Sequence, residues 1–285
     1  MTALTDTLTL STGANIPVLG LGTWFIDDDR AAQTVKDAVA AGYCNIDTAQ
    51  AYGNERGVGE GVRTCGVPRG ELFISTKLAA EIKDYEGAVA AIDGSLEKLG
   101  LDYVDLMLIH APQPWDDFRG GNYDEGNLAA WRALEEAFAD GKLKAIGVSN
   151  FREHDLDNII DNAGVTPHVN QILVHAGNTP ADLIDYCRDR DIVVEAYSPI
   201  AHGEILDNPQ VRELAAKYGV SVPQLCIRYT LQLGCVSLPK TANPEHMRTN
   251  AEVNFTIGDA DMDALKTLDA RDYGESSGFP VYSGK

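Results

Sequence analysis

Short apolar segments rich in β-branched residues alternate with longer amphipathic segments along the whole chain. Eight of the short segments have the length and composition of strands, and they span residues 17–23, 43–47, 72–77, 104–110, 144–149, 169–174, 192–197 and 236–239. Such alternation is typical of βαβ units, in which neighbouring strands run parallel. The pattern therefore predicts an α/β protein built around a parallel sheet.

The longer segments carry the signals of helices. Two of them end just before Gly42 and Gly100, and glycine readily adopts the left-handed conformation that closes a helix. The clearest helical segments are residues 29–41, 85–99, 209–218 and 223–233. Ahead of the first strand, a segment that turns at Thr12-Gly13 predicts a short N-terminal β-hairpin, which would plug the bottom of a barrel.

Length and continuity favour one architecture. Eight strands and at least eight helices within 285 residues match the usual size of a (β/α)8 barrel, also called a TIM barrel. No linker, repeat, charge block or low-complexity tract divides the chain. Residues 1–285 are therefore predicted to form a single (β/α)8 barrel domain, and an open doubly wound sheet is the alternative.

The charge balance is strongly acidic. Asp and Glu total 43 against 23 Lys and Arg, which gives a formal net charge of -20 at pH 7. Such a surface repels phosphate backbones and anionic lipids, so neither nucleic acid nor a membrane is expected as a partner. The excess rests on 27 Asp rather than 16 Glu, and only 10 Lys are present.

This composition resembles that of proteins from salt-accumulating halophiles. Repulsion among carboxylates weakens as screening increases, and the Debye length falls from about 10 Å at 0.1 M salt to about 3 Å at 1 M. We therefore predict a halophilic protein that gains stability in molar salt. An ordinary acidic protein from a mesophile is the alternative.

Several features predict a cytoplasmic location. The first basic residue is Arg30, so the preceding segment lacks the charged and apolar regions of a secretory signal. No apolar run reaches the length that spans a membrane. The five cysteines are odd in number and lack a CxxC spacing, as expected for reduced thiols. A monomer or a weak oligomer is expected.

Polar residues stand at or just beyond the C-terminal ends of the predicted strands, which is where the active site of a barrel lies. Taken singly, each has an ordinary structural explanation, such as a helix cap for Asp47 or a core histidine for His110. A lysine and an aspartate on neighbouring strand ends, however, are costly to bury unless they pair. Asp47 and Lys77 are therefore expected in one cleft. The polar residues are Asp47, Tyr52, Lys77, His110, Ser149, Asn150, Gln171, Tyr197 and Lys240.

Several of these residues lie in motifs that resemble the aldo-keto reductases. The most specific motif is DTAQAYGNE from Asp47, and it is supported by STK from Ser75, GVSNF from Gly147 and AYSP from Ala196. The resemblance runs from GLGTW at the first strand to KTANPE after the last. It implies an NAD(P)H-dependent carbonyl reductase with a small carbonyl compound as substrate. The catalytic tetrad of the family would map to Asp47, Tyr52, Lys77 and His110.

The chemistry of carbonyl reduction suits these residue types. The reaction delivers a hydride to carbon and a proton to oxygen, so it needs an acid beside the developing alkoxide. Tyr52 is the expected acid, and Lys77 is expected to lower the pKa of its phenol from about 10. Asp47 would keep Lys77 cationic. His110 would donate a hydrogen bond that orients the substrate carbonyl.

The resemblance also implies the cofactor site, with NADPH as the hydride donor, or NADH. Ser149, Asn150 and Gln171 would hold the nicotinamide amide, and Tyr197 would stack on the ring. His246 stands where the family usually has arginine, and a neutral imidazole binds phosphate weakly, so Arg248 is expected to compensate in part. The full predicted set is Gly22, Thr23, Trp24, Asp47, Ser149, Asn150, Gln171, Tyr197, Ser198, Ile200, Gly203, Lys240, Thr241, Asn243, His246, Arg248 and Asn250.

The predicted substrate pocket departs from the family in one place. Many members have Trp-Pro after the tetrad histidine, whereas His110 is followed by Ala111-Pro112. Loss of the indole should widen the pocket there, and Trp115 would refill part of the space. Trp24 and Tyr52 would complete the substrate contacts. The tail, residues 279–285, is expected either to cover the pocket or to be disordered.

Two alternative functions remain open from the sequence. Lys77 could instead act as a Schiff-base nucleophile, which would require a desolvated amine rather than one paired with Asp47. The protein could also be a reductase-like subunit that binds nicotinamide and senses redox state. Motifs of zinc hydrolases, serine esterases and P-loop NTPases are lacking, and no metal site is expected.

Overall fold

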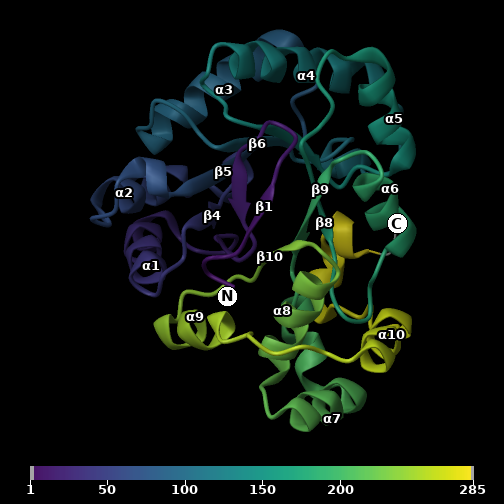
Figure 1. The fold of residues 1–285 in the computed structure, drawn as a ribbon. Coiled ribbons are helices and arrows are strands. Elements are labelled where there is room, and N and C mark those ends of the chain that lie inside the picture. Colours follow the sequence, from purple (N-terminus) through teal and green to yellow (C-terminus); the bar gives the residue numbers. More distant parts are fainter. Residues whose placement is uncertain (1–2, 284–285) are drawn as a thin grey trace.

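The computed structural model describes residues 3–283 as an eight-stranded parallel barrel surrounded by helices (Figure 1). The strands follow one another around the sheet in chain order from β3 to β10. They are β3 (Gly20–Gly22), β4 (Asn45–Asp47), β5 (Phe73–Leu78), β6 (Leu106–Ile109), β7 (Ile146–Ser149), β8 (Val169–Leu173), β9 (Val193–Tyr197) and β10 (Val236–Leu238).

The first and last strands close the barrel. The Ser237 amide donates to the Val18 carbonyl at 2.7 Å, and the Gly22 amide donates to the Pro239 carbonyl at 3.1 Å. Parallel bridges join the two strands at the same places. The predicted (β/α)8 barrel is therefore confirmed, and the alternative of an open doubly wound sheet is wrong.

Helices cover the outside of the barrel, and their ends follow the predicted glycine signals. Helix α3 ends at Gly100, which has a φ of 62° and a backbone amide that donates to the Glu97 carbonyl. The helices are α1 (Asp28–Ala40), α2 (Glu55–Thr64), α3 (Tyr85–Leu99), α4 (Asp124–Ala139), α5 (Glu153–Asn162), α6 (Ala181–Arg188), α7 (Pro209–Tyr218), α8 (Val222–Gln232), α9 (Pro244–Ala251) and α10 (Asp259–Thr267).

The N-terminal hairpin is present as predicted. Its strands β1 (Thr7–Thr9) and β2 (Asn15–Pro17) pair antiparallel and lie across the barrel in Figure 1. Leu10 and Ile16 are buried and belong to one apolar cluster with Phe73 and Val236 from the barrel strands. The hairpin therefore plugs the barrel with apolar side chains, and the burial of these side chains stabilises the plug.

The barrel interior leaves little room where β7 packs beside its two neighbouring strands. A Cβ atom at Gly147 on β7 would lie 2.4 Å from the Val169 carbonyl oxygen and 2.8 Å from the Leu108 side chain. Only glycine fits there. Because side chains alternate along a strand, the next inward position on β7 is Ser149, which stands in register with Gln171 on β8. Close strand packing thus brings the polar strand ends together.

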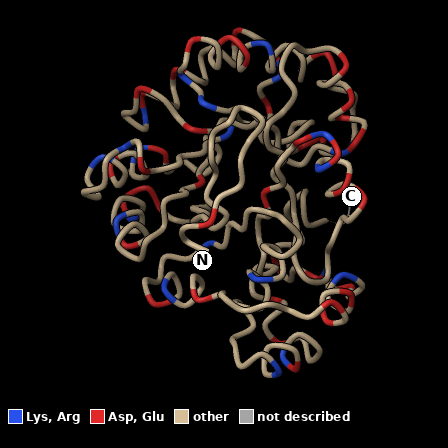
Figure 2. Tube along the Cα trace, viewed as in Figure 1, with Lys and Arg blue, Asp and Glu red and all other residues tan. Residues whose placement is uncertain are grey.

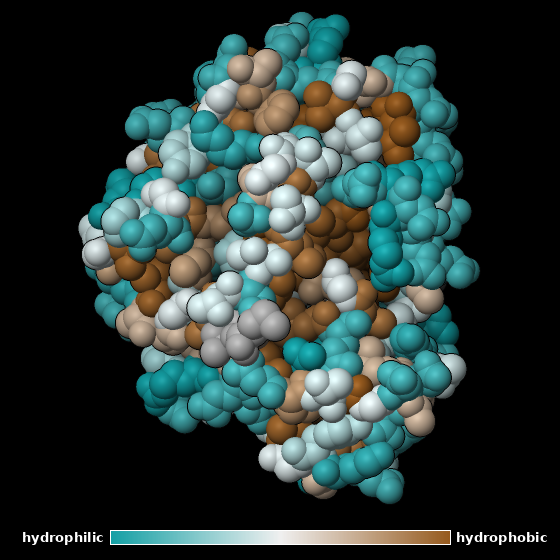
Figure 3. All heavy atoms as spheres, viewed as in Figure 1, coloured by the Kyte–Doolittle hydropathy of each residue, from teal (hydrophilic) through white to brown (hydrophobic). Residues whose placement is uncertain are grey.

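The surface matches the acidic composition. Asp and Glu positions, coloured red, are frequent along the outer helices in Figure 2, and hydrophilic residues dominate the rim of the face drawn in Figure 3. Many ion pairs on these helices are exposed, such as Arg188 with Asp185 at 2.6 Å. Exposed pairs of this kind contribute little to stability. Among residues 3–283, no helix is long and apolar enough to cross a membrane.

Candidate active site

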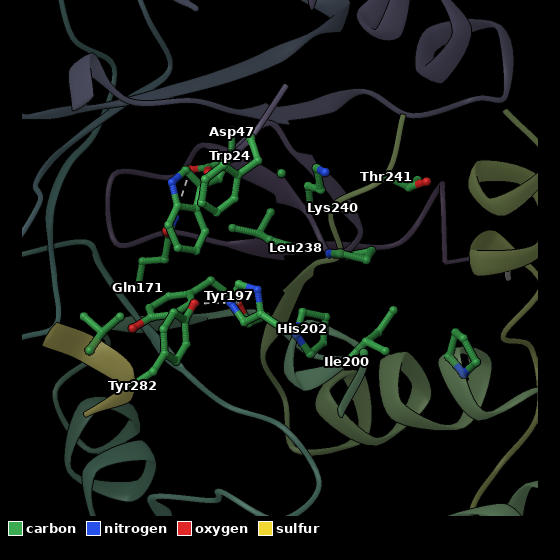
Figure 4. Close-up of a pocket in the computed structure, with 18 of the residues that line it drawn as sticks. Trp24, Asp47, Gln171, Tyr197, Ile200, His202, Leu238, Lys240, Thr241 and Tyr282 are labelled. Carbon is green, nitrogen blue, oxygen red and sulfur yellow. Dashed lines mark hydrogen bonds between the residues drawn. The ribbon is translucent and has the colours of Figure 1, made fainter. Parts of the chain in front are cut away.

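A cavity of about 960 Å³ lies at the C-terminal ends of the barrel strands. This volume is at the upper end of the range for small-molecule sites. Figure 4 shows Asp47, Trp24 and Gln171 toward one end and Thr241 toward the other. The predicted residues that line the cavity are Gly22, Trp24, Asp47, Tyr52, His110, Trp115, Ser149, Asn150, Gln171, Tyr197, Ser198, Ile200, Gly203, Lys240, Thr241, His246 and Asn250.

Four predicted site residues stand behind the cavity wall or beside it. Lys77 is buried beneath the wall, and the Thr23 hydroxyl donates to the Asp47 carbonyl at 2.9 Å. The Asn243 side chain caps α9 by accepting from the Glu245 amide at 2.9 Å. The Arg248 guanidinium pairs with the Glu245 carboxylate. The prediction that Arg248 compensates for His246 stays a prediction.

Lys77 and Asp47 form a buried ion pair, as predicted. The Lys77 ammonium donates to the two Asp47 carboxylate oxygens at 2.7 and 2.8 Å and to the Thr48 carbonyl at 2.8 Å. Burial lowers the pKa of Lys77, but the Asp47 carboxylate and the Tyr52 hydroxyl outweigh it, so the pKa is raised. Lys77 therefore remains a cation, and its hydrogen bonds hold it in the wall.

The Tyr52 hydroxyl lies 3.3 Å from the Lys77 ammonium and faces the same cavity. Burial raises the pKa of Tyr52 by more than Lys77 lowers it, and the Asp47 carboxylate adds to the increase. The expected net decrease in this pKa is thus wrong for the protein without a bound ligand. Tyr52 carries its proton at neutral pH, and the ammonium stands ready to stabilise a phenolate when the proton leaves.

His110 completes the predicted tetrad beside Tyr52. The two rings are 5.7 Å apart between centroids, and the Trp115 ring lies 5.1 Å from His110 on the other side. Burial and the nearby Lys77 ammonium hold the pKa of His110 well below its usual value, so the imidazole is neutral. Its Nδ1 atom is buried and has no hydrogen-bond partner among the described residues. A neutral imidazole can still donate one hydrogen bond.

Asn150 ties three strand ends together at one side of the cavity. Its amide group donates to the His110 carbonyl and to the Ser149 hydroxyl, each at 3.0 Å. Its side-chain oxygen accepts from the Tyr197 hydroxyl at 2.7 Å. The backbone of Asn150 is left-handed, with a φ of 63°, and the Arg119 guanidinium donates to its carbonyl at 2.9 Å. These bonds fix the Asn150 amide and the Tyr197 ring.

The Gln171 amide connects the Lys77–Asp47 pair to a carboxyl group that sequence reasoning missed. Its Nε2 atom donates to Asp47 at 3.0 Å and to Glu195 at 2.9 Å. Glu195 is wholly buried on β9. In the sequence, Glu195 is a single acidic residue within the otherwise uncharged strand Val193–Tyr197, and this was the one signal that could have drawn attention to it.

The other end of the cavity carries a cation, an anion and neutral polar groups. Lys240, Thr241 and His246 line it together with Ser221, Gln224 and Glu252, which were not predicted. The three unpredicted residues come from the starts or ends of helices, and they lack any motif. The amide and hydroxyl groups at one end, the Tyr197 ring and the Lys240 cation fit the parts of a nicotinamide dinucleotide.

The C-terminal tail covers the cavity, which resolves the two alternatives for its described part. Residues 279–282 line the cavity, and the Tyr282 and Ser198 hydroxyls are 2.8 Å apart. The Tyr282 ring stacks with Trp24 at 6.2 Å between centroids, and the His202 ring packs against Trp24 at 5.4 Å. Residues 284–285 lie outside the described chain.

The comparisons with known proteins agree with this geometry. The model of the aldo/keto reductase family matches residues 18–270. The chain is 41% identical to glyoxal reductase from Bacillus subtilis (strain 168) over 269 residues, which cover 94% of this chain and 94% of that protein. Its fold is similar to that of an aldo/keto reductase from Brucella melitensis, with a TM-score of 0.86, 39% identity and coverage of 93% and 99% of the two chains.

A third relative was solved with a ligand. The Bombyx mori aldo-keto reductase in complex with NADP is 32% identical, with a TM-score of 0.84 and coverage of 97% of this chain and 98% of that chain. The match of the family model covers most of the sequence, and the relatives are covered almost to their full lengths. This chain therefore belongs to the aldo/keto reductase family.

Proposed function

We propose that the protein is an alcohol:NADP+ oxidoreductase that reduces aldehyde or ketone carbonyls to alcohols, with Tyr52 as the proton donor. The observation that carries this proposal is the Tyr52 hydroxyl at the cavity wall, 3.3 Å from the buried Lys77 ammonium. A protonated phenol beside a fixed cation is an acid whose conjugate base is stabilised in place. Family membership supports the same reaction class.

The protein groups divide the work of proton transfer. Tyr52 gives its proton to the substrate oxygen as negative charge develops there. Lys77 stabilises the resulting phenolate, and Asp47 keeps Lys77 charged through two hydrogen bonds. His110, which is neutral, donates a hydrogen bond to the same oxygen and orients the carbonyl. Trp24 and Trp115 bound the space for the rest of the substrate.

A nicotinamide cofactor, when bound, supplies the hydride. Ser149, Asn150 and Gln171 would hold its amide, and Tyr197 would cover the ring. Ser198, Ile200 and Gly203 would face its pyrophosphate. Lys240, Thr241, His246 and Asn250 would face its adenosine phosphate. A solved relative in complex with NADP supports a cofactor of this class.

An assay of carbonyl turnover tests the proposal. Purified protein is mixed with NADPH or NADH and a panel of carbonyl compounds, from glyoxal and glyceraldehyde to aromatic aldehydes. Glyoxal is included because a relative is named as a glyoxal reductase. We expect loss of the reduced cofactor's near-ultraviolet absorbance with at least one aldehyde. Cofactor binding without turnover of any compound, even in a single turnover, would instead support the redox-sensing subunit.

The Schiff-base alternative is disfavoured by the surroundings of Lys77. Its ammonium lies within hydrogen-bond distance of four oxygen atoms in the wall and is wholly buried. A nucleophilic amine must be neutral and must reach the substrate. Borohydride should therefore trap no carbonyl substrate on this lysine.

With His246 in place of the family's arginine, we expect only a modest preference for NADPH over NADH. One substitution should increase this preference. His246 lines the adenosine end of the cavity together with the cation Lys240 and the anion Glu252. Arginine binds phosphate through two parallel hydrogen bonds. His246→Arg is expected to lower the Kd of NADPH about tenfold, which corresponds to about 1.4 kcal/mol. Fluorescence titration measures both cofactors, and NADH is the control. Equal tightening of NADH would contradict a phosphate contact.

We further propose that the acidic surface is an adaptation to high salt. The formal charge of -20 is spread over exposed carboxylates, whose mutual repulsion weakens as salt screens it. The Tm is expected to rise steadily from dilute buffer to molar KCl in a thermal unfolding experiment. A Tm that stays level or falls would reject this adaptation. The cytoplasmic location and the monomeric or weakly oligomeric state remain predictions.

A further inference from the structure

Glu195 is a buried carboxyl group that the proposed proton transfer does not use. It stands on β9, two residues before Tyr197, and its position is in register with Gln171 on β8 and Val236 on β10. Its exposure is 0%, and its Oε1 atom has no hydrogen-bond partner among the described residues. Burial of a carboxyl with one unpartnered oxygen costs folding free energy, so a functional role would explain why this residue is present.

The contact with Gln171 has a direct consequence at the cavity wall. The Nε2 atom of Gln171 donates to Glu195 Oε2 at 2.9 Å and to Asp47 Oδ1 at 3.0 Å. An amide nitrogen has two hydrogens, and both are used by these acceptors. The amide is therefore held in one orientation, with its oxygen left as the group that can accept from a ligand. Gln171 is one of the residues that line the cavity.

Glu195 also changes the charge balance beneath the cavity. The charged groups that act on it are Asp47 on β4 and Lys77 on β5, while its strand neighbours present the neutral Gln171 and the apolar Val236. Lys77 supplies one positive charge, and Asp47 already neutralises it. Burial and the Asp47 carboxylate raise the pKa of Glu195 to about 7, against the opposing effects of Gln171 and Lys77. Its carboxyl therefore gains or loses a negative charge in the neutral range.

We propose that Glu195 is a positioning residue that orients the Gln171 amide toward the cofactor and, through its own proton, makes the preference for oxidised over reduced cofactor depend on pH. The inference rests on the proposed function. The oxidised nicotinamide ring carries a positive charge and the reduced ring is neutral, so an ionised Glu195 attracts only the oxidised form. By linkage, binding of NADP+ must then favour release of the Glu195 proton.

The wild-type protein provides the first test. The Kd values of NADP+ and NADPH are measured by quenching of tryptophan fluorescence, since Trp24 and Trp115 line the cavity, over one pH unit either side of about 7. The ratio of Kd for NADP+ to Kd for NADPH is expected to fall about fivefold as pH rises, at the lower end of typical coupling. Both cofactors have the same adenosine end, so contacts at that end, including those of His246, cancel in the ratio. His110 is already neutral across this range.

Variants identify the residue responsible. Glu195→Gln keeps the size of the side chain and an acceptor for Gln171, but it cannot ionise, so the ratio should become independent of pH. The matched control is Asp105→Asn, which alters a partly buried carboxyl that pairs with Arg69 at the opposite end of β5 and β6. This control should retain the wild-type pH dependence.

A second measurement uses only the wild-type protein and so does not depend on the folding of a variant. Calorimetry in buffers of different ionisation enthalpy should show proton release when NADP+ binds near pH 7, and less release with NADPH. A ratio that is flat in the wild type, or that keeps its slope in Glu195→Gln, overturns the inference about Glu195. Failure of both cofactors to bind would overturn the proposed function itself.

Discussion

Replacement of Tyr52 by phenylalanine is expected to lower kcat for carbonyl reduction by about 10²–10⁴-fold, the usual contribution of a positioned general acid. The substitution removes the hydroxyl that lies 3.3 Å from Lys77 and leaves the ring in place. Without that hydroxyl, the protein has no proton donor next to Lys77 for the substrate oxygen. The Kd of NADPH should change little, because Tyr52 is not among the residues expected to hold the cofactor. Steady-state kinetics and fluorescence titration measure the two quantities separately.

Tyr282→Phe is the matched control for this prediction. Tyr282 lines the same cavity, but its hydroxyl contacts Ser198 rather than Lys77. Loss of one such hydrogen bond is worth about 0.5–1.5 kcal/mol, so its effect on rate should stay within about tenfold. If Tyr52→Phe retained a rate comparable to that of Tyr282→Phe, Tyr52 would not be the proton donor.

Lys77→Met is expected to have the largest effect on stability. It leaves the Asp47 carboxylate buried without its cation, and breaking a buried ion pair in this way destabilises proteins by about 3–5 kcal/mol. The pKa of Lys77 is raised in the folded protein. Its stabilisation is therefore complete below the unfolded pKa of about 10.4 and is lost only as pH rises through the folded value. Titration of Lys77 itself therefore adds no pH dependence to this loss near neutral pH. Urea unfolding measures the loss, and turnover should fall with it.

The double variant Lys77→Met/Asp47→Asn separates the two effects. Removal of the unpaired charge should restore most of the free energy of unfolding, because an uncompensated carboxylate no longer lies in the interior. Turnover should remain low, since no cation stabilises the Tyr52 phenolate. Recovery of turnover together with stability would mean that Lys77 acts only as a structural residue.

The arrangement of strands and helices was predictable because it follows from local patterns. The run at 72–77 begins with three large apolar residues and includes the β-branched Ile74 and Thr76, and β5 (Phe73–Leu78) is buried on both faces of a parallel sheet. Helix α3 ends at Gly100 because the backbone there is left-handed. Barrel closure does not follow from local patterns, since the contact between β3 and β10 joins residues that are far apart in the chain.

The candidate site was predictable to the extent that its residues lie in motifs at strand ends. Asp47, Tyr52 and His110 meet around one cavity because parallel strands deliver their C-terminal ends to the same rim. Arg248 pairs on the surface with Glu245, three residues away, and its part in binding the cofactor stays a prediction. Glu195 was missed, because its significance depends on Gln171 across the strand pair.

The sequence by itself determined the order of strands and helices, the acidic surface and the identity of the groups at the strand ends. These properties depend on residue type and on near neighbours. Only the tertiary structure decided the protonation of Tyr52 and His110, the coverage of the cavity by the C-terminal tail and the link from Lys77 to Glu195. The physical reason is that burial and charge act through space, and both depend on which distant segments the closed barrel brings into contact.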